Sequence, residues 1–222
     1  NYSLPFIDDF YKEYWTKPLE ELSGENFKGL QNRKVVIIAR CCNNQEKLSF
    51  KQAGKELDLS YLRTQIALEG HQLGKLDIYG KGWPEGISRG SSRGGNYIAK
   101  KLDILSEYNF NLCFENTNFD YYCTEKIWDS ICAYCLPIYY GRGNKIYEDF
   151  PQNSFIDFCD FDNTSQLFDY IKNMSVEEYL ERMNLCIKVY NNVCKKLDSV
   201  DRYEQFLMRV VHKVKTIVQG TK

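Results

Sequence analysis

Two residues at the start of a predicted helix, Glu125 and Lys126, are the side chains best suited to chemistry in this sequence. We expect the helix to begin at Thr124, so both residues fall in its first turn. A helix N-terminus presents free backbone N–H groups and a partial positive charge, which favours anions such as phosphate. A lysine at this place is disfavoured by about 0.3–1 kcal/mol unless an anion lies beside it. The position of Lys126 therefore predicts a phosphate site.

Glu125 suggests that the phosphate belongs to a nucleotide. A carboxylate accepts hydrogen bonds from a pair of vicinal hydroxyls, as in the recognition of nucleotide ribose. The alternative interpretation is that Glu125 and Lys126 are solvated side chains on an exposed first turn. Their spacing alone does not decide between the two interpretations.

The surrounding elements predict an α/β fold with a parallel sheet and helices on both faces. Short apolar runs rich in β-branched residues are typical of strands that are buried on both faces. Amphipathic helices alternate with these runs, as in a doubly wound sheet. The predicted strands are residues 35–39, 76–79, 110–114, 136–140 and 154–158, and the predicted helices begin near Ser60, Tyr97, Thr124, Thr164 and Ser175. Such sheets bind ligands at the carboxyl ends of their strands.

The overall composition excludes several classes of protein. Twenty-nine Lys+Arg against thirty Asp+Glu leave a formal net charge of -1, so no global positive field draws the chain to nucleic acid. No apolar run approaches the ~18 residues of a membrane span, and we expect no transmembrane segment.

The nine cysteines show no paired zinc-ligand spacing. Cys132 and Cys135 form a C-x-x-C motif, but both fall late in the helix predicted over residues 124–135. We therefore expect free buried thiols, no metal site, and a reducing compartment, the cytoplasm. Because the sequence begins at Asn1 and not at a methionine, this localisation is provisional.

The segment 110–141 resembles the donor-binding signature of glycosyltransferase family 10, the α-1,3/1,4-fucosyltransferases. That signature is approximately F-N-L-x-F-E-N, a short aromatic loop, T-E-K-[IL]-x-D, and P-[IV]-Y-x-G. The matching residues are 110–116, Tyr121 with Tyr122, 124–129 and 137–141. Weaker similarity extends downstream to 149–151 and 153–156 and upstream to Leu62-Arg63 and 77–80, so that it covers about residues 35–190.

The resemblance implies a Rossmann-like domain, the donor-binding half of a GT-B glycosyltransferase. It implies an inverting transfer of fucose from GDP-fucose to a glycan hydroxyl, without a tightly bound metal ion. Arg63 and Lys126 would contact the diphosphate, and Glu125 the ribose or nearby hydroxyls. The implied donor-binding residues are Arg63, Glu115 and Asn116 on the fucose side, Tyr122 at the nucleotide, Thr124, Glu125 and Lys126. No catalytic residue is assigned.

The pattern of apolar and polar residues also divides the chain. We expect residues 1–32 to form a helix and linker, 33–200 the Rossmann-like GDP-sugar-binding domain, and 201–222 an amphipathic helix packed on that domain. A full-length family member carries a further N-terminal domain that holds the acceptor and supplies the general base, and residues 1–32 are too few to form it. A separate acceptor-binding domain, a partner subunit, a water molecule or an early carboxylate would then supply the base. The early carboxylates are Asp8, Asp9, Glu13, Glu20, Glu21 and Glu25.

Two other functions stay open. One is a GT-B donor domain that uses another sugar nucleotide, and the other is a non-catalytic module that binds nucleotide sugars without an acceptor domain. The preference for nucleotide base and sugar distinguishes a fucosyltransferase from a donor domain for another sugar nucleotide. GDP release in the presence of an acceptor sugar distinguishes both enzymes from the non-catalytic module.

Overall fold

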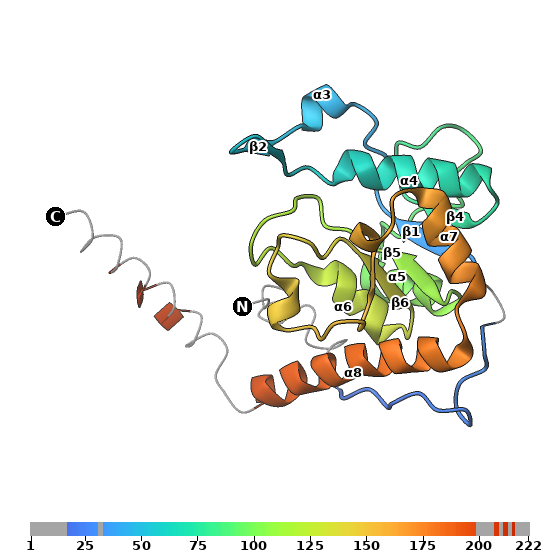
Figure 1. Ribbon diagram of the computed structural model, residues 1–222, viewed down its shortest axis with the longest axis vertical. Coiled ribbons are helices and arrows are strands. Elements are labelled where there is room, and N and C mark those ends of the chain that lie inside the picture. The colour runs from blue at the N-terminus through green and yellow to red at the C-terminus, as the bar shows by residue number, and fades with distance from the viewer. Residues whose placement is uncertain (1–16, 31–32, 199–206, 209–210, 213–214, 216–222) are drawn as a thin grey trace.

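The computed structural model describes residues 17–30, 33–198, 207–208, 211–212 and 215 of the 222 residues (Figure 1). One parallel sheet dominates this part of the chain. Its strands are β1 (Val35–Ile38), β4 (Leu76–Tyr79), β5 (Phe110–Leu112), β6 (Leu136–Tyr139) and β7 (Ile156–Asp157). They lie in the order β4-β1-β5-β6-β7. In the register of β1, Val35 is opposite Leu76 on one side and Phe110 on the other.

Helices connect the strands and cover the sheet. The longer ones are α4 (Ser60–Gln72), α5 (Tyr97–Ser106), α6 (Glu125–Cys132), α7 (Thr164–Asn173) and α8 (Val176–Asp198). The chain moves one way across the sheet through α4 and back through α5, so right-handed crossovers put these two helices on opposite faces. α7 packs against α4, whereas α6 packs against α5 and α8 (Figure 1). The structure thus has the predicted α/β architecture with helices on both faces.

The strands form the hydrophobic core, as their apolar sequences predict. Val35, Val36 and Ile37 of β1 are each at most 1% exposed. On α6, Trp128 and Ile131 are fully buried on the side that faces the sheet. Each fully buried aliphatic side chain contributes about 1.5–3 kcal/mol relative to an exposed one. This core therefore fixes where the strand ends and the start of α6 lie.

Three predicted elements had boundaries wrong by two residues or more, and one of them is the strand predicted over 110–114, which ends at Leu112. The helix expected to reach Cys135 ends at Cys132, because Tyr134 adopts a left-handed conformation with φ of 54° and the N–H of Cys135 bonds back to the carbonyl of Ser130. The last predicted strand, 154–158, is reduced to β7. The Asp157 carboxylate accepts from the N–H of Cys159 and caps a 3-10 helix, η2 (Phe158–Asp160), which ends the strand early.

Residues 17–30 form an irregular segment that lies along α8. Asn191 and Asn184 of α8 each exchange two hydrogen bonds with its backbone, at Leu19 and Leu22, over 2.7–2.8 Å. Farther along α8, the hydroxyl of Tyr179 donates to the carbonyls of Asn109 and Tyr134, which precede β5 and β6. The segment is therefore fixed near the amino ends of the strands. Residues 1–16 and most of the helix expected over 201–222 lie outside the described residues.

Candidate functional site

The strand order reverses between β1 and β5, because the chain leaves β1 for β4 on one side and later returns to β5 on the other. In open α/β sheets, ligands bind beyond the carboxyl ends of the strands at such a reversal. Residues 113–124 begin at this point and lead into α6. Six of the seven predicted donor-binding residues lie in this segment or in the first turn of α6, and Arg63 lies on the adjacent α4.

Glu115 is the centre of a hydrogen-bonded cluster at the start of α6. Its Oε1 accepts from the N–H of Thr124 at 2.7 Å and from the hydroxyl of Tyr139 at 3.3 Å. Its Oε2 accepts from Oγ1 of Thr124 at 2.7 Å and from Nζ of Lys126 at 2.9 Å. Glu115 is 1% exposed. Both carboxylate oxygens are thus committed to neighbouring protein groups.

This cluster changes the argument made from Lys126. From the sequence alone, an external anion is expected to compensate a lysine in the first turn of a helix. In the structure the buried carboxylate of Glu115 is that anion, and it also lies at the positive end of the α6 dipole. The position of Lys126 alone is therefore no reason to infer a phosphate. Thr124 is the N-cap residue, as predicted, but its hydroxyl bonds to Glu115 and Lys126 and not to the helix backbone.

A second lysine enters the site from α5, and the sequence analysis missed it. Nζ of Lys101 lies 2.5 Å from Oδ2 of Asp129 and 3.8 Å from Oε1 of Glu125. Nζ of Lys126 lies 3.7 Å from the same Oε1. Asp129 is 1% exposed between Trp128 and Ile131 of α6, and a carboxylate amid apolar neighbours is a signal that a cationic partner exists. The identity of that partner depends on the packing of α5 on α6, which the sequence does not encode locally.

These neighbours set the charge states within the cluster. Burial acts to raise the pKa of Glu125, but the attraction of Lys101 and then of Lys126 outweighs it, so the pKa is lowered. Burial acts to lower the pKa of Lys101, but Asp129 and then Glu125 outweigh it, so that pKa is raised. Both groups are therefore charged at neutral pH.

Arg63 projects from α4 toward the segment after β5. NH1 donates to the carbonyl of Phe114 at 2.6 Å, and NH2 donates to Oδ1 of Asn116 at 3.1 Å. The side chain is buried, with 5% exposure for the residue. Its Nε is buried and has no hydrogen-bond partner among the described residues. Arg63 thus holds the backbone at Phe114, before Glu115, and the side chain of Asn116, after it.

The structure brings the predicted residues together to different degrees. Glu115, Thr124 and Lys126 are in direct contact, Glu125 is within 3.7 Å of Lys126, and Asn116 contacts Arg63. Tyr122 lies in the same loop, where its N–H donates to the carbonyl of Phe119, and its side chain is on the surface at 38% exposure. The role of each residue toward a donor stays a prediction.

A pocket of about 470 Å³ opens at the carboxyl ends of β6 and β7. Its lining consists of Asp120, Gly141, Arg142, Gly143, Lys145, Tyr147, Gln152, Asp157 and Asp160. None of the predicted donor-binding residues is among them. Asp157 organises this part, because it accepts from the N–H of Gly141 at 3.0 Å and from the hydroxyl of Tyr147 at 2.8 Å. The pocket lining includes Asp120, which belongs to the same segment after β5 as Glu115.

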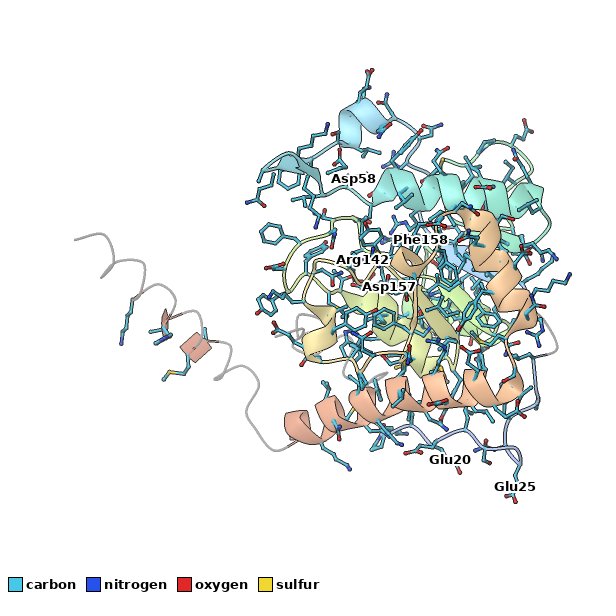
Figure 2. The ribbon with its side chains drawn as sticks, in the orientation of Figure 1. Glu20, Glu25, Asp58, Arg142, Asp157 and Phe158 are labelled. Carbon is cyan, nitrogen blue, oxygen red and sulfur yellow. The ribbon has the colours of Figure 1, made fainter. Side chains whose placement is uncertain are left out.

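Figure 2 shows where the early carboxylates lie. Arg142 and Asp157 are on the side of the molecule toward α4, whereas Glu20 and Glu25 lie beyond α8 at the other end. This agrees with the attachment of residues 17–30 to α8, which contacts the amino ends of the strands. The suggestion that Glu20 or Glu25 supplies a base at this site was therefore wrong for the described arrangement.

Within the described ranges, no group of three or more His, Cys, Asp or Glu side chains is arranged to hold a metal ion. In the same part of the chain, none of the helices combines the length and apolar character needed to span a membrane.

Comparison with known proteins adds to this geometry. The family model described as glycosyltransferase family 10 (fucosyltransferase) C-term matches residues 34–209. The alpha-(1,3)-fucosyltransferase FucT of Helicobacter pylori is 35% identical over 130 residues, which are 57% of this chain and 26% of that protein. The 3-galactosyl-N-acetylglucosaminide 4-alpha-L-fucosyltransferase FUT3 of Pan troglodytes is 28% identical over 131 residues, 58% of this chain and 32% of that protein. The chain thus spans between a quarter and a third of the length of these relatives.

Solved structures show a similar fold. The crystal structure of an alpha1,3-fucosyltransferase aligns with a TM-score of 0.50 and 24% identity over 78% of this chain and 47% of that one. A crystal structure of alpha1,3-fucosyltransferase with GDP-fucose gives the same TM-score and identity and covers 78% of this chain and 49% of that one.

Proposed function

The chain belongs to glycosyltransferase family 10, and from this premise we propose that it binds GDP-fucose as the donor-binding part of a fucosyltransferase. Relatives of this chain are named fucosyltransferases, and one solved structure of similar fold contains GDP-fucose. The proposed reaction transfers fucose to a glycan hydroxyl with inversion at the anomeric carbon. The donor would lie beyond the carboxyl ends of β1 and β5, beside the start of α6.

The observation that carries the proposal is the family match over residues 34–209, taken together with the exposure of Lys126 at the start of α6. The ammonium group has three N–H donors, and its hydrogen bonds to Glu115 and Thr124 use two of them. The side chain is 21% exposed, so the third donor is accessible to a phosphate oxygen. Departure of GDP builds negative charge on the β-phosphate, and a preorganised ammonium beside a helix N-terminus stabilises that charge without a bound divalent cation. The Nε of Arg63 is buried without a hydrogen-bond partner among the described residues, and we propose it as a second donor toward the diphosphate.

Glu125 is suited to the ribose. Its side chain is 31% exposed and its pKa is lowered, so it is an ionised acceptor for vicinal hydroxyls. Donor binding is the part of the reaction that these residues address. Transfer also needs a general base for the acceptor hydroxyl, worth about 10²- to 10⁴-fold in rate, and we assign it to an acceptor-binding domain or partner subunit.

Isothermal titration calorimetry with GDP, GDP-fucose, GDP-mannose and a UDP-sugar tests this function. We expect GDP and GDP-fucose to bind and the UDP-sugar to bind more weakly. Preference for GDP-mannose or for a UDP-sugar would favour a donor domain for another nucleotide sugar. In the protein that includes an acceptor-binding part, GDP release that depends on a glycan acceptor would exclude the non-catalytic module.

The cellular compartment is also a proposal. All nine cysteines are free in the structure, and we propose a reducing compartment, the cytoplasm, for this reason. Fractionation of cells that express the protein, followed by thiol labelling before and after reduction, tests it. Disulfide-linked cysteines in freshly isolated protein would overturn it.

A further inference from the structure

Five charged side chains from three parts of the fold form a continuous row at the proposed donor site. In order they are Glu115 after β5, Lys126 and Glu125 of α6, Lys101 of α5, and Asp129 of α6. Their signs alternate along the row. Both ends of the row are buried, with side-chain exposures of 1% for Glu115 and for Asp129, and Glu125 in the middle is the most exposed of the five at 31%.

Glu125 is held from two sides in this row. Both ammonium groups approach the same oxygen, Oε1, with Nζ of Lys101 at 3.8 Å and Nζ of Lys126 at 3.7 Å. The two lysines come from different helices, so the carboxylate is fixed relative to α5 as well as to its own helix. The contact of 2.5 Å between Lys101 and Asp129 fixes the ammonium group of Lys101 in turn.

The stability of the fold does not by itself require an ion pair between Lys101 and Asp129. Burying an ion pair is costly, and two apolar side chains of similar volume often replace such a pair without loss of stability. The ionic pair differs from an apolar pair in one respect that bears on function, because it leaves a fixed positive charge next to Glu125. A fixed charge there keeps Glu125 ionised and restrains its carboxylate before a ligand arrives.

We propose that Lys101 is a positioning residue for donor binding, which acts through Glu125 and is itself anchored by Asp129. The inference rests on the proposed function, since it assigns Glu125 to the ribose hydroxyls. Lys101 does not touch the donor in this account. Removal of Lys101 is expected to lower the affinity for every ligand that carries the ribose. The loss is expected to be equal for ligands with and without phosphates.

The first test measures Glu125 without any ligand. The charged groups that act on Glu125 are Lys101 from α5 and Lys126 and Asp129 from α6, and Lys126 in turn pairs with Glu115 from the segment after β5. Carbon-13 NMR of the carboxyl carbon, assigned by its loss in Glu125→Gln, follows the titration with pH. We expect the pKa of Glu125 to be higher in Lys101→Met than in the natural chain, and higher in Lys101→Met/Asp129→Asn than in Asp129→Asn. Lys100→Met removes the same charge from the neighbouring exposed position of α5 and is expected to leave it unchanged.

The double variant separates positioning from a purely structural role. Lys101→Met alone leaves Asp129 buried without its cation and is expected to lower stability, and Asp129→Asn is expected to restore it. A pKa of Glu125 in the stable double variant equal to that in Asp129→Asn alone would overturn the inference, because these two variants differ only at position 101. This holds even if the single variant does not fold, because the double variant then carries the test.

The second test compares GDP with guanosine by calorimetry. In the double variant we expect the affinities for GDP and for guanosine to fall by the same factor, about tenfold. This is the loss expected for one well-placed hydrogen bond to a charged group. Weakening of GDP alone would overturn the inference, because Lys101 would then act on the phosphates directly. Full affinity in the double variant would also overturn it. Failure of the natural chain to bind either ligand counts against the proposed function, while the Glu125 titration still decides the role of Lys101.

Discussion

Glu115 and Lys126 form an ion pair across the first turn of α6, with 2.9 Å between Oε2 and Nζ. The two partners differ in exposure, at 1% for the side chain of Glu115 and 21% for that of Lys126. The anion is therefore sealed within the protein while the cation borders solvent. This asymmetry makes the carboxylate a permanent part of the fold and leaves the ammonium able to meet a ligand.

Glu115→Gln is expected to lower the free energy of unfolding by about 2–3 kcal/mol, because the amide keeps the shape but loses the charge that pairs with Lys126. Urea unfolding followed by circular dichroism measures the change. Glu148→Gln is a matched control, because Glu148 is 52% exposed and pairs at 3.7 Å with an exposed lysine. Such surface pairs contribute little, and the free energy of unfolding is expected to change by less than about 0.5 kcal/mol. Equal unfolding free energies for the two variants would contradict a structural role of Glu115.

The strand ends and the start of α6 were predictable from sequence because they follow from local patterns. Apolar runs gave β1, β4, β6 and the start of β5 nearly to the residue, and Thr124 is the residue that precedes α6 as expected. The internal pairing of Lys126 was not predictable in this way. Glu115 lies eleven residues upstream, and only the packing of β5 beside β6 brings its side chain to the helix start.

Lys101 and Arg63 illustrate the same limit. Each depends on the approach of two elements that are distant in sequence, α5 to α6 for Lys101 and α4 to the segment after β5 for Arg63. Arg63 was chosen for its resemblance to a family position, and its buried bonds to Phe114 and Asn116 were not foreseen. Sequence patterns therefore located the site but not the internal contacts of its charges.

Lys126→Ala is expected to weaken GDP by about 10- to 100-fold and guanosine much less, because the ammonium is assigned to a phosphate and a hydrogen bond between charged groups is worth about 1.5–3 kcal/mol. Calorimetry with both ligands gives the ratio. Lys188→Ala removes an equally charged residue that is 58% exposed on α8, and it is expected to change neither affinity. Equal weakening of GDP and guanosine would count against the phosphate assignment.

Acidification is expected to release the turn that precedes β2 (Lys51–Gln52), where Glu56 of β3 (Lys55–Glu56) accepts from the hydroxyl of Ser49 and the N–H of Phe50. The hydrogen bond from Ser49, followed by those from the N–H groups of Asp58 and Phe50, lowers the pKa of Glu56 to about 2 from an ordinary value of 4.5. Because the pKa of Glu56 is lower in the folded state, its ionised carboxylate stabilises the turn fully at pH values above 4.5. This stabilisation is lost as the pH falls through about 2.

The amide proton resonance of Phe50 reports this release. Its chemical shift is expected to titrate with a midpoint near pH 2, and the titration is expected to be absent in Glu56→Gln. A midpoint near 4.5 would show that the bonds from Ser49 and Phe50 do not persist in solution.

Gly141→Ala is expected to distort the pocket beside β6 and β7. A Cβ at this position would lie 2.6 Å from Oδ2 of Asp157 and 3.0 Å from the rings of Phe155 and Tyr147. Asp157 cannot yield easily, because its oxygens accept from Gly141, Tyr147 and Cys159. Overpacking of this kind costs about 1–3 kcal/mol of unfolding free energy.

Gly24→Ala is the control for this substitution, since a Cβ at Gly24 meets no atom within 4 Å. Its unfolding free energy is expected to stay within about 0.5 kcal/mol of that of the natural chain. Urea midpoints of the two variants give the comparison. If Gly141→Ala unfolds at the same urea concentration as Gly24→Ala, Asp157 has moved without cost, and the hydrogen bonds that define the pocket wall contribute little to stability. A lowered midpoint for Gly141→Ala alone means that the wall is rigid, because the added methyl group then has no space to occupy.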